Sequence, residues 1–434
     1  MNKDIGLIFI GEKNLKQGWP YKGFDSIREA ETLRDMIISF SKKWGLTIDY
    51  NYFGVLTNKE ELDNVKDNLL AMDGFVVTYL TTGRVYDIFR EIVSLGKPTI
   101  IYAQPFSGHE WRLYSELKDK SRSIIFASDN IQDLINKIKL LDVVLSLKNS
   151  RILMFTDRIP DKKYLDEIKN SYVSEIIRLD HNVLNKYYHE TDEDQARRHA
   201  DIVIAQALNV IEPSYDEIIK ALRIYYALKN ALRDYNANSV TIDCLSMIFH
   251  KAIPTTPCIA FSLLNDEGIP AACEADLNSL ITMILLRYLA DKPSFISDPV
   301  PDFSNGYLYH AHCTSATRLR GINREQEKYY LRNHAESLSG VAVQTLWPIG
   351  SKVTSVKIEL RERILLLHTG EVVKNLYVNK GCRTKFATKV SDVRRFVEEF
   401  RGGLHRVIIV GDYIEEMKEI GKLMGLKIIE EMKY

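Results

Sequence analysis

Short apolar runs that alternate with helix-length segments dominate the first 145 residues of this chain. Runs of this kind, short and without alternating polar positions, are typical of strands buried on both faces of a parallel sheet. They are IGLIFI (5–10), GFVVTYL (74–80), PTIIYA (98–103) and SIIFA (123–127). The intervening segments have helix-start signals, with capping-box spacings at Ser26 with Glu29 and at Thr57 with Glu60. Residues 1–145 are therefore predicted to form a doubly wound α/β domain.

The same alternation of strand-like and helix-like segments resumes after a polar segment and continues to about residue 305. NSRILMFTD (149–157) is predicted to be its first strand, and a long helix is predicted to begin near Ser214. TPCIAFSLL (256–264) is predicted to be a further strand. We therefore expect a second parallel-sheet, Rossmann-like domain over residues 146–305.

Beyond residue 305 the pattern changes to alternating polar and apolar residues. TSVKIELRERILLLHTGEVVKNLYV (354–378) alternates and is interrupted at Thr369-Gly370, which predicts an antiparallel hairpin that turns there. The last 31 or so residues read as a strand, a helix and a strand. Residues 306–434 are predicted to form a β-rich, barrel-like C-terminal domain.

Composition excludes several classes of partner. Lys plus Arg and Asp plus Glu both number 58, so no net charge draws the protein to nucleic acid or to an anionic membrane. No uncharged apolar stretch approaches the ~18 residues that a membrane span needs, and the N-terminus reads as a strand. The five cysteines form no CxxC pair, which favours a reducing, cytoplasmic setting. Walker A, GxGxxG, HExxH and GxSxG motifs are absent from the sequence.

Two acids stand close together in GIPAACEADLNSLITMILL (268–286). Asp276 lies directly before a predicted helix, where its side chain is expected to act as the N-cap. Glu274 is expected at the carboxyl end of a strand, and Asp298 at the end of the next strand, the sheet edge where ligands bind in α/β proteins. Each acid can instead pair with one of the many Lys or Arg residues.

A histidine pair follows these acids. GYLYHAHCT (306–314) places His310 and His312 two residues apart, and hence on one face of a strand. Two carboxylates with imidazole suit Mn²⁺, Co²⁺ or a similar divalent cation better than structural zinc. Cys273 and Cys313 adjoin these residues, and alternation along a strand predicts that they point to the opposite face as small core residues.

An ordered set of segments resembles L-fucose isomerase and related proteins, with the L-arabinose isomerases as more distant relatives. The set comprises the Glu274–Asp298 pair, YHAHCT, NHAESLSGVAVQTLWPIGSKVTSVKI (333–358) and GGLHRVIIVGDYIEEM (402–417). The resemblance is strongest over residues 255–425. It implies a homo-oligomer, a hexamer in the family, that isomerises a pentose or 6-deoxyhexose such as L-fucose or D-arabinose through an enediol.

The same resemblance implies a ligand set for a catalytic Mn²⁺, with Co²⁺ or Mg²⁺ as substitutes. Glu274, Asp298 and His405 stand in the family's order, and His312 matches a further histidine of the arabinose isomerases. Glu274 and Asp298 would also exchange protons with the substrate. His334 is an alternative candidate for a metal ligand or for a contact with the substrate.

Other interpretations stay open. His109 and Trp111 are weak candidates for contributing to a neighbouring subunit's site, with packing or surface roles as the alternative. His189 and His199 are expected on a solvated helix face. A sugar-binding or regulatory protein, in which two α/β lobes clamp a ligand without chemistry, is the rival function.

Overall fold

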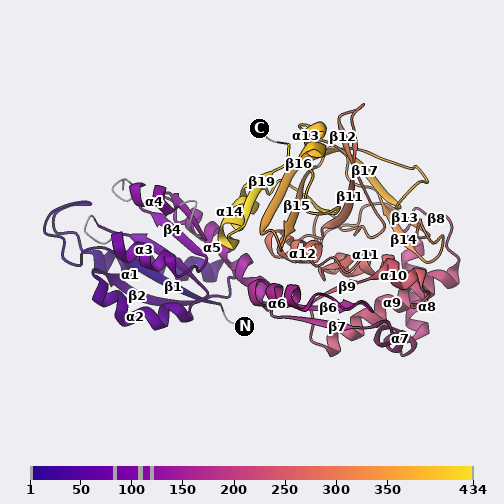
Figure 1. Cartoon of the computed structure of the whole chain (residues 1–434), viewed down its shortest axis with the longest axis horizontal. Helices are drawn as coiled ribbons and strands as arrows, with labels where there is room; N and C mark the ends of the chain where they lie inside the picture. Colours follow the sequence, from indigo (N-terminus) through magenta and orange to yellow (C-terminus); the bar gives the residue numbers. More distant parts are fainter. Residues whose placement is uncertain (1–2, 82–85, 106–110, 118–121, 433–434) are drawn as a thin grey trace. The chain divides into compact units, whose positions relative to one another are not determined.

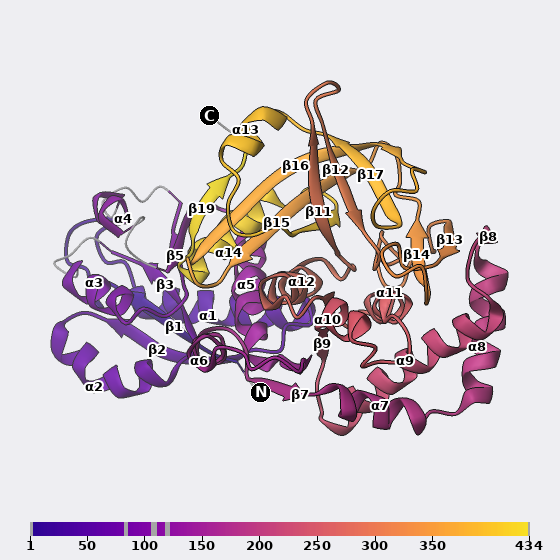
Figure 2. The same cartoon turned by 45° about the vertical axis from the view of Figure 1, so that its right-hand side comes forward.

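The computed structural model describes residues 3–81, 86–105, 111–117 and 122–432. The chain divides into two compact units, Met1–Ser146 with Glu415–Lys427, and Leu147–Ile414 with Ile428–Tyr434 (Figures 1 and 2). The predicted fold class is confirmed, since two parallel sheets are followed by a mixed, β-rich sheet. Among the helices of the described chain, none is both long and apolar enough to cross a membrane.

The first unit contains a five-stranded parallel sheet in the order β2-β1-β3-β4-β5. Its strands are β1 (Asp4–Ile10), β2 (Asp49–Leu56), β3 (Gly74–Tyr79), β4 (Thr99–Ala103) and β5 (Ser123–Ala127). Its helices are α1 (Ser26–Lys43), α2 (Lys59–Ala71), α3 (Tyr86–Ser94), α4 (Trp111–Leu117), α5 (Ile131–Ser146) and, from near the C-terminus, α14 (Ile414–Met424). All four predicted strands are present. The prediction missed β2, an edge strand whose residues are mostly half-buried.

Both helix-start signals in this unit are displaced by one residue from their predicted positions. The N-cap of α1 is Asp25, whose carboxylate accepts the Arg28 N–H, and the N-cap of α2 is Asn58, which accepts the Glu61 N–H. A charged or amide oxygen caps at least as well as a hydroxyl, so the neighbouring Asp and Asn take the position.

The second unit begins with a four-stranded parallel sheet in the order β10-β9-β6-β7. Its strands are β6 (Arg151–Phe155), β7 (Glu175–Leu179), β9 (Ser239–Ile242) and β10 (Ala271–Cys273). The helical segments around it are η1 (Leu147–Asn149), α6 (Lys162–Ser171), α7 (His181–His189), α8 (Glu193–Gln206), α9 (Tyr215–Asp234), α10 (Cys244–Phe249), α11 (Cys258–Asp266) and α12 (Leu277–Ala290). Helix α9 begins at a capping box of Ser214 and Glu217, as predicted for its N-terminus.

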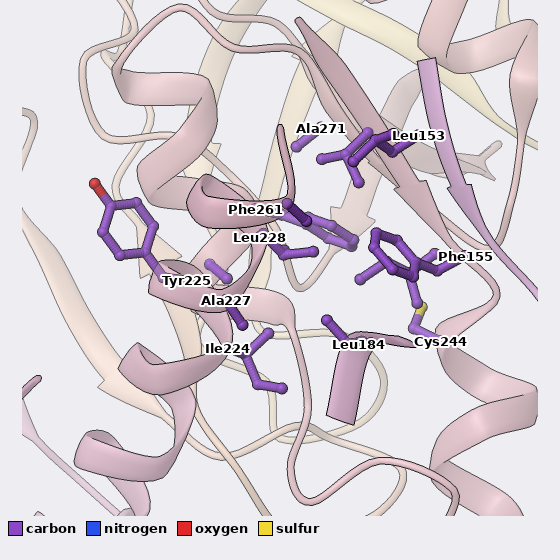
Figure 3. Packing of buried hydrophobic residues seen from close by; sticks show 14 of the residues in the cluster. Leu153, Phe155, Leu184, Ile224, Tyr225, Ala227, Leu228, Cys244, Phe261 and Ala271 are labelled. Atoms are coloured by element: carbon purple, nitrogen blue, oxygen red, sulfur yellow. The ribbon is translucent and has the colours of Figure 1, made fainter. Parts of the chain in front are cut away.

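The prediction of a strand at 256–264 is wrong, because these residues form most of helix α11. A short apolar run is compatible with either structure when both sides of the element are buried. Figure 3 shows Phe261 of α11 packed in the core between Leu153 and Phe155 of β6 and Leu228 of α9. Its neighbour Ile259 belongs to a different core cluster, so the helix is apolar on nearly every side.

The remaining large sheet is a closed barrel with one added strand. Neighbouring strands pair in the order β15-β18-β11-β12-β17-β16, β16 pairs back with β15, and β19 is attached to β16. The strands are β11 (Phe295–Asp302), β12 (Tyr307–His312), β15 (Lys352–Glu359), β16 (Ile364–Asn375), β17 (Thr384–Lys389), β18 (Arg406–Val410) and β19 (Lys427–Glu430). Helix α13 (Val393–Glu398) follows β17. Phe295, Trp347 and Phe386 belong to one apolar cluster of buried side chains, with the rings of Trp347 and Phe386 stacked at 4.0 Å.

The predicted hairpin exists, but its turn is not at Thr369-Gly370. Strands β15 and β16 are joined at residues 360–363, and Thr369 and Gly370 lie inside β16. A Cβ at Gly370 would approach the Thr388 Cβ of β17 to 2.9 Å. This glycine permits close strand packing and does not mark a turn.

A small third sheet has the order β14-β13-β8. It consists of β8 (Asn209–Val210), β13 (Tyr329–Arg332) and β14 (Ala342–Thr345). The three-domain division at residues 145 and 305 stays a prediction. In the structure, β11 of residues 295–302 pairs with the barrel strands β12 and β18.

Candidate metal centre

A strained turn presents Glu274 at the carboxyl end of β10. Glu274 and Ala275 both have left-handed backbone angles, with φ of 63° and 53°, a conformation that non-glycine residues rarely adopt. The Ala275 N–H donates to the Ile242 carbonyl at 3.0 Å. Asp276 caps α12 as predicted, accepting from the Ser279 N–H at 2.9 Å and from its hydroxyl at 2.6 Å. The turn is thus held at both ends.

Glu274 meets two of the predicted histidines. Its carboxylate oxygens lie 3.6 Å from His312 Nε2 and 3.6 Å from His405 Nε2. One ligand atom from each of these three residues lies within 4.8 Å of the other two. This is the arrangement in which a divalent cation can be shared.

Asp298 joins this group through His405. Its Oδ1 lies 3.4 Å from His405 Nε2, and this buried oxygen has no hydrogen-bond partner in the described part of the chain. Unlike the prediction, Asp298 is in the middle of β11 and not at its end. It therefore belongs to the barrel, whereas Glu274 follows a strand of the parallel sheet.

The donor set fits a divalent metal ion. Carboxylate and imidazole groups suit Mn²⁺, Co²⁺ and similar cations. An unpartnered buried carboxylate oxygen is costly unless a cation is present beside it. Glu274, His312, His405 and Asp298 are the residues that would hold such an ion.

His405 is oriented by a carboxylate that sequence reasoning assigned only to the helix cap. His405 Nδ1 lies 2.9 Å from Asp276 Oδ2, and the Lys357 ammonium lies 3.3 Å from the same oxygen. A hydrogen bond from Nδ1 to Asp276 leaves Nε2 with its lone pair facing Glu274 and Asp298. Metal-binding histidines generally have such a partner. The signal in the sequence was the Glu-Ala-Asp spacing, which placed Asp276 two residues from Glu274.

Electrostatics in the group follow from these contacts. Burial alone would raise the pKa of Asp276, but the His405 hydrogen bond and the Lys357 charge hold it well below its ordinary value. Burial would lower the pKa of His312, but its contact with Glu274 and the charge of Asp298 raise it to about 9. The contact with His312 in turn lowers the pKa of Glu274. A bound cation would take the place of the proton that these carboxylates hold on His312.

The cysteines beside the site are buried, as predicted, but one does not point away. Cys273 and Cys313 are each 2% exposed. Cys273 Sγ lies 3.9 Å from His312 Nδ1 and 3.6 Å from the Thr314 hydroxyl. Its sulfur therefore packs against the ring of a proposed ligand.

The other predicted histidines lie elsewhere. His310 is enclosed near Phe386, with Nε2 2.9 Å from the Thr388 hydroxyl and Nδ1 3.3 Å from that of Ser297. His334 Nδ1 contacts the Ser337 hydroxyl at 3.0 Å, and His334 is not part of the metal-ligand group.

Of the weaker candidates, His109 lies outside the described residues. Trp111 is 43% exposed and makes an edge contact with Tyr114. His199 contacts the Tyr226 hydroxyl at 3.0 Å and is half-buried, so its side chain is not on a fully solvated face.

Comparisons with known proteins give one distant likeness. No family model matches the chain. A sulfoquinovose isomerase from Alkalicoccus urumqiensis is 22% identical over 216 residues, 47% of this chain and 46% of that protein. One from Clostridium sp. (strain MSTE9) is 28% identical over 96 residues, 22% of this chain and 21% of that protein. The matches therefore span less than half the length of these curated relatives.

Solved structures give weaker matches. An ABC transporter solute-binding protein from Burkholderia multivorans is 10% identical, with 68% of this chain and 95% of that chain covered and a TM-score of 0.20. One from Agrobacterium vitis, bound with alpha-D-tagatopyranose, is 13% identical, with 56% and 76% covered and a TM-score of 0.18. Scores this low do not indicate a shared overall arrangement.

Proposed function

We propose that this chain is a metal-dependent aldose–ketose isomerase, related to the L-fucose isomerases, that acts on a pentose or 6-deoxyhexose. The observation that carries the proposal is the convergence of Glu274, His312 and His405 with the unpartnered oxygen of Asp298. The distant similarity to sulfoquinovose isomerases supports the same reaction class. L-Fucose and D-arabinose are the representative substrates.

The chemistry requires a proton to move between C1 and C2 of the sugar. A bound divalent cation would supply the Lewis acidity that makes this proton acidic. Glu274 and Asp298, with side chains 32% and 29% exposed, are accessible to a substrate and partly shielded from water. One of these carboxylates takes the proton and returns it to the adjacent carbon. Asp276 keeps His405 in the tautomer and orientation that the group requires.

Ketose formation from an aldose panel tests the proposal. We expect turnover that stops with chelator and returns best with Mn²⁺ or Co²⁺, because the donors are carboxylates and imidazoles. Glu274→Gln is expected to lower kcat by roughly 10²–10⁴-fold, the usual contribution of a general acid or base. The matched control is Glu336→Gln, an exposed acid near His334.

Full turnover by a rigorously metal-free preparation would contradict the metal requirement. Sugar binding without turnover of any aldose, at full metal occupancy, would favour the rival function of a non-catalytic sugar-binding protein. A homo-oligomer, hexameric by the family resemblance, is also proposed, and light scattering after gel filtration measures its mass.

A further inference from the structure

The second unit contains a cavity of about 220 Å³ that is separate from the metal centre. Side chains of helices α8 and α11, of strands β13 and β14, and of the segment 317–326 line it. The proposed metal ligands are not among these lining residues. Sites for drug-sized ligands usually enclose ~300–1,000 Å³, so an occupant of this cavity is a smaller molecule.

Buried hydrogen bonds hold the walls of this cavity in place. Asp266 of α11 is 5% exposed and accepts from the Thr317 N–H at 2.8 Å, the Thr317 hydroxyl at 2.6 Å and the Arg318 N–H at 2.6 Å. The Tyr329 hydroxyl of β13 donates to the Val203 carbonyl of α8 at 3.0 Å. The cavity is therefore formed before any ligand binds, as small-molecule sites usually are.

The charged side chains around the cavity are already balanced. Glu267 is ion-paired with Lys229 at 2.7 Å. The charge of Arg318 acts on Asp266 and opposes the rise to about 6 that burial causes in the pKa of this carboxyl group. Burial lowers the pKa of His199, so its imidazole is neutral at pH 7. A charged ligand would upset this balance, whereas an uncharged ligand would keep it.

Three lining side chains have polar atoms with no hydrogen-bond partner in the described chain. They are the amides of Gln206 and Gln326 and the Nε2 atom of His199, whose Nδ1 contacts the Tyr226 hydroxyl at 3.0 Å. An amide presents a donor and an acceptor side by side, so it complements a ligand edge that does the same.

The rest of the lining includes an apolar wall. It is formed by Ile202, Val203, Ile259, Leu263, Tyr329 and Val343. A polyol has hydroxyl groups on both faces, and those against this wall would lose their hydrogen bonds to water without replacement. A flat ring with its polar groups at one edge avoids this cost.

We propose that this cavity binds an uncharged planar ring with an amide-like edge, the chemistry shared by nucleobases and aromatic carboxamides. The ring contacts the apolar wall, and its edge bonds to Gln206, Gln326 and His199. The site does not depend on the proposed isomerase function. Its wall at Thr317 belongs to the segment that leads away from His312 at the end of β12.

Binding of four small probes to the full chain tests the class of ligand. Nicotinamide, nicotinate and 3-(aminomethyl)pyridine share one ring and are neutral, anionic and cationic at pH 7. Adenine represents the nucleobases. We expect nicotinamide to bind more tightly than both charged pyridines, with dissociation constants measured by saturation-transfer NMR titration. The tighter binder of nicotinamide and adenine distinguishes a carboxamide site from a nucleobase site, and either result supports the proposal.

Two variants test the location. Ile202 lines the cavity and is 52% exposed, so Ile202→Trp should fold and raise the dissociation constant on the order of 10-fold or more by filling space. Ile211→Trp is the control, because Ile211 is 49% exposed and is not a lining residue. Gln326→Leu should raise the constant by about 2- to 10-fold, the usual strength of a neutral hydrogen bond. Gln195→Leu, at an exposed position of α8 outside the cavity, is its control.

Thermal unfolding of each variant separates lost binding from lost folding, and Gln326→Leu decides the location if Ile202→Trp unfolds. Tighter binding of nicotinate or 3-(aminomethyl)pyridine than of nicotinamide would overturn the assignment to uncharged ligands. No binding of either nicotinamide or adenine would overturn the site. Equal affinities in each variant and its control would place the binding elsewhere and also overturn the proposal.

Discussion

Glu274 and Asp276 are two residues apart but have different surroundings. Glu274 has a left-handed φ and faces two histidines. Asp276 accepts hydrogen bonds from the first turn of α12 and from His405. A non-glycine residue in the left-handed region costs on the order of 1–3 kcal/mol. The cap and the Ala275 hydrogen bond to β9 offset that cost and fix the direction of the Glu274 side chain.

Replacing Asp276 by Asn separates these roles. Asparagine caps helices as well as aspartate, but it leaves the buried Lys357 ammonium without its counter-charge, so we expect the thermal unfolding midpoint to fall. Loss of the charge beside His405 Nδ1 should weaken Mn²⁺ binding about 10- to 100-fold, the usual effect of removing such a partner. Calorimetry measures the dissociation constant. Asp180→Asn, at the N-cap of α7, is the control, and equal Mn²⁺ affinity in the two variants would contradict the orienting role.

At the level of strands, close packing between β16 and β17 requires a glycine. The added Cβ at Gly370 would meet the Thr388 Cβ at 2.9 Å and the Lys389 carbonyl at 3.2 Å. The neighbouring Thr369 is exposed on the same strand. The alternation of this segment predicted strands correctly, but the turn lies at residues 360–363, which include no glycine.

Gly370→Ala is therefore expected to lower the free energy of unfolding by about 1–3 kcal/mol through overpacking. Thr369→Ala, one residue away, should change it by less than about 0.5 kcal/mol, as an exposed substitution usually does. Denaturant unfolding followed by circular dichroism measures both. Equal changes in the free energy of unfolding for the two variants would contradict the overpacking expected at Gly370.

For the chain as a whole, a buried ionic cluster links the C-terminal segment to the loop that carries His405. Arg406 is 0% exposed, pairs with Glu431 at 2.7 Å, and donates to the backbone carbonyls of Arg401, Gly403 and His405. Glu431 also contacts His368 Nδ1 at 2.8 Å. Burial would raise the pKa of Glu431, but these partners lower it to about 2.

This cluster predicts a specific loss of stability in acid. The folded-state pKa of Glu431 lies below its ordinary value of 4.5. The contribution of Glu431 to the free energy of unfolding is therefore complete above pH 4.5 and is lost as the pH falls toward about 2. Glu431→Gln should cost about 3–5 kcal/mol at pH 7, since it leaves Arg406 buried without a counter-charge. The difference between wild type and variant should shrink below pH 4.5. Denaturant unfolding across pH 7 to 3 checks this, and a difference independent of pH would contradict it.

The sequence alone determined the elements whose signal is local. Continuous apolar runs identified four of the five parallel strands of the first unit, alternation identified β15 and β16, and the position before an apolar helix identified Asp276 as a cap. The proposed site residues were named through a family resemblance that depends on their order in the chain. Spacing alone did not separate His310 from His312, which were predicted on one strand face, and the resemblance selected His312.

Tertiary structure decided what depends on contacts between distant segments. Whether the run at 256–264 is a helix or a strand depended on burial on several sides, which the local pattern does not distinguish. That Asp276 bonds His405, 129 positions away, follows from the packing of helix α12 against strand β18. Strand register sets such juxtapositions, and register is fixed by packing between segments that are far apart in the chain.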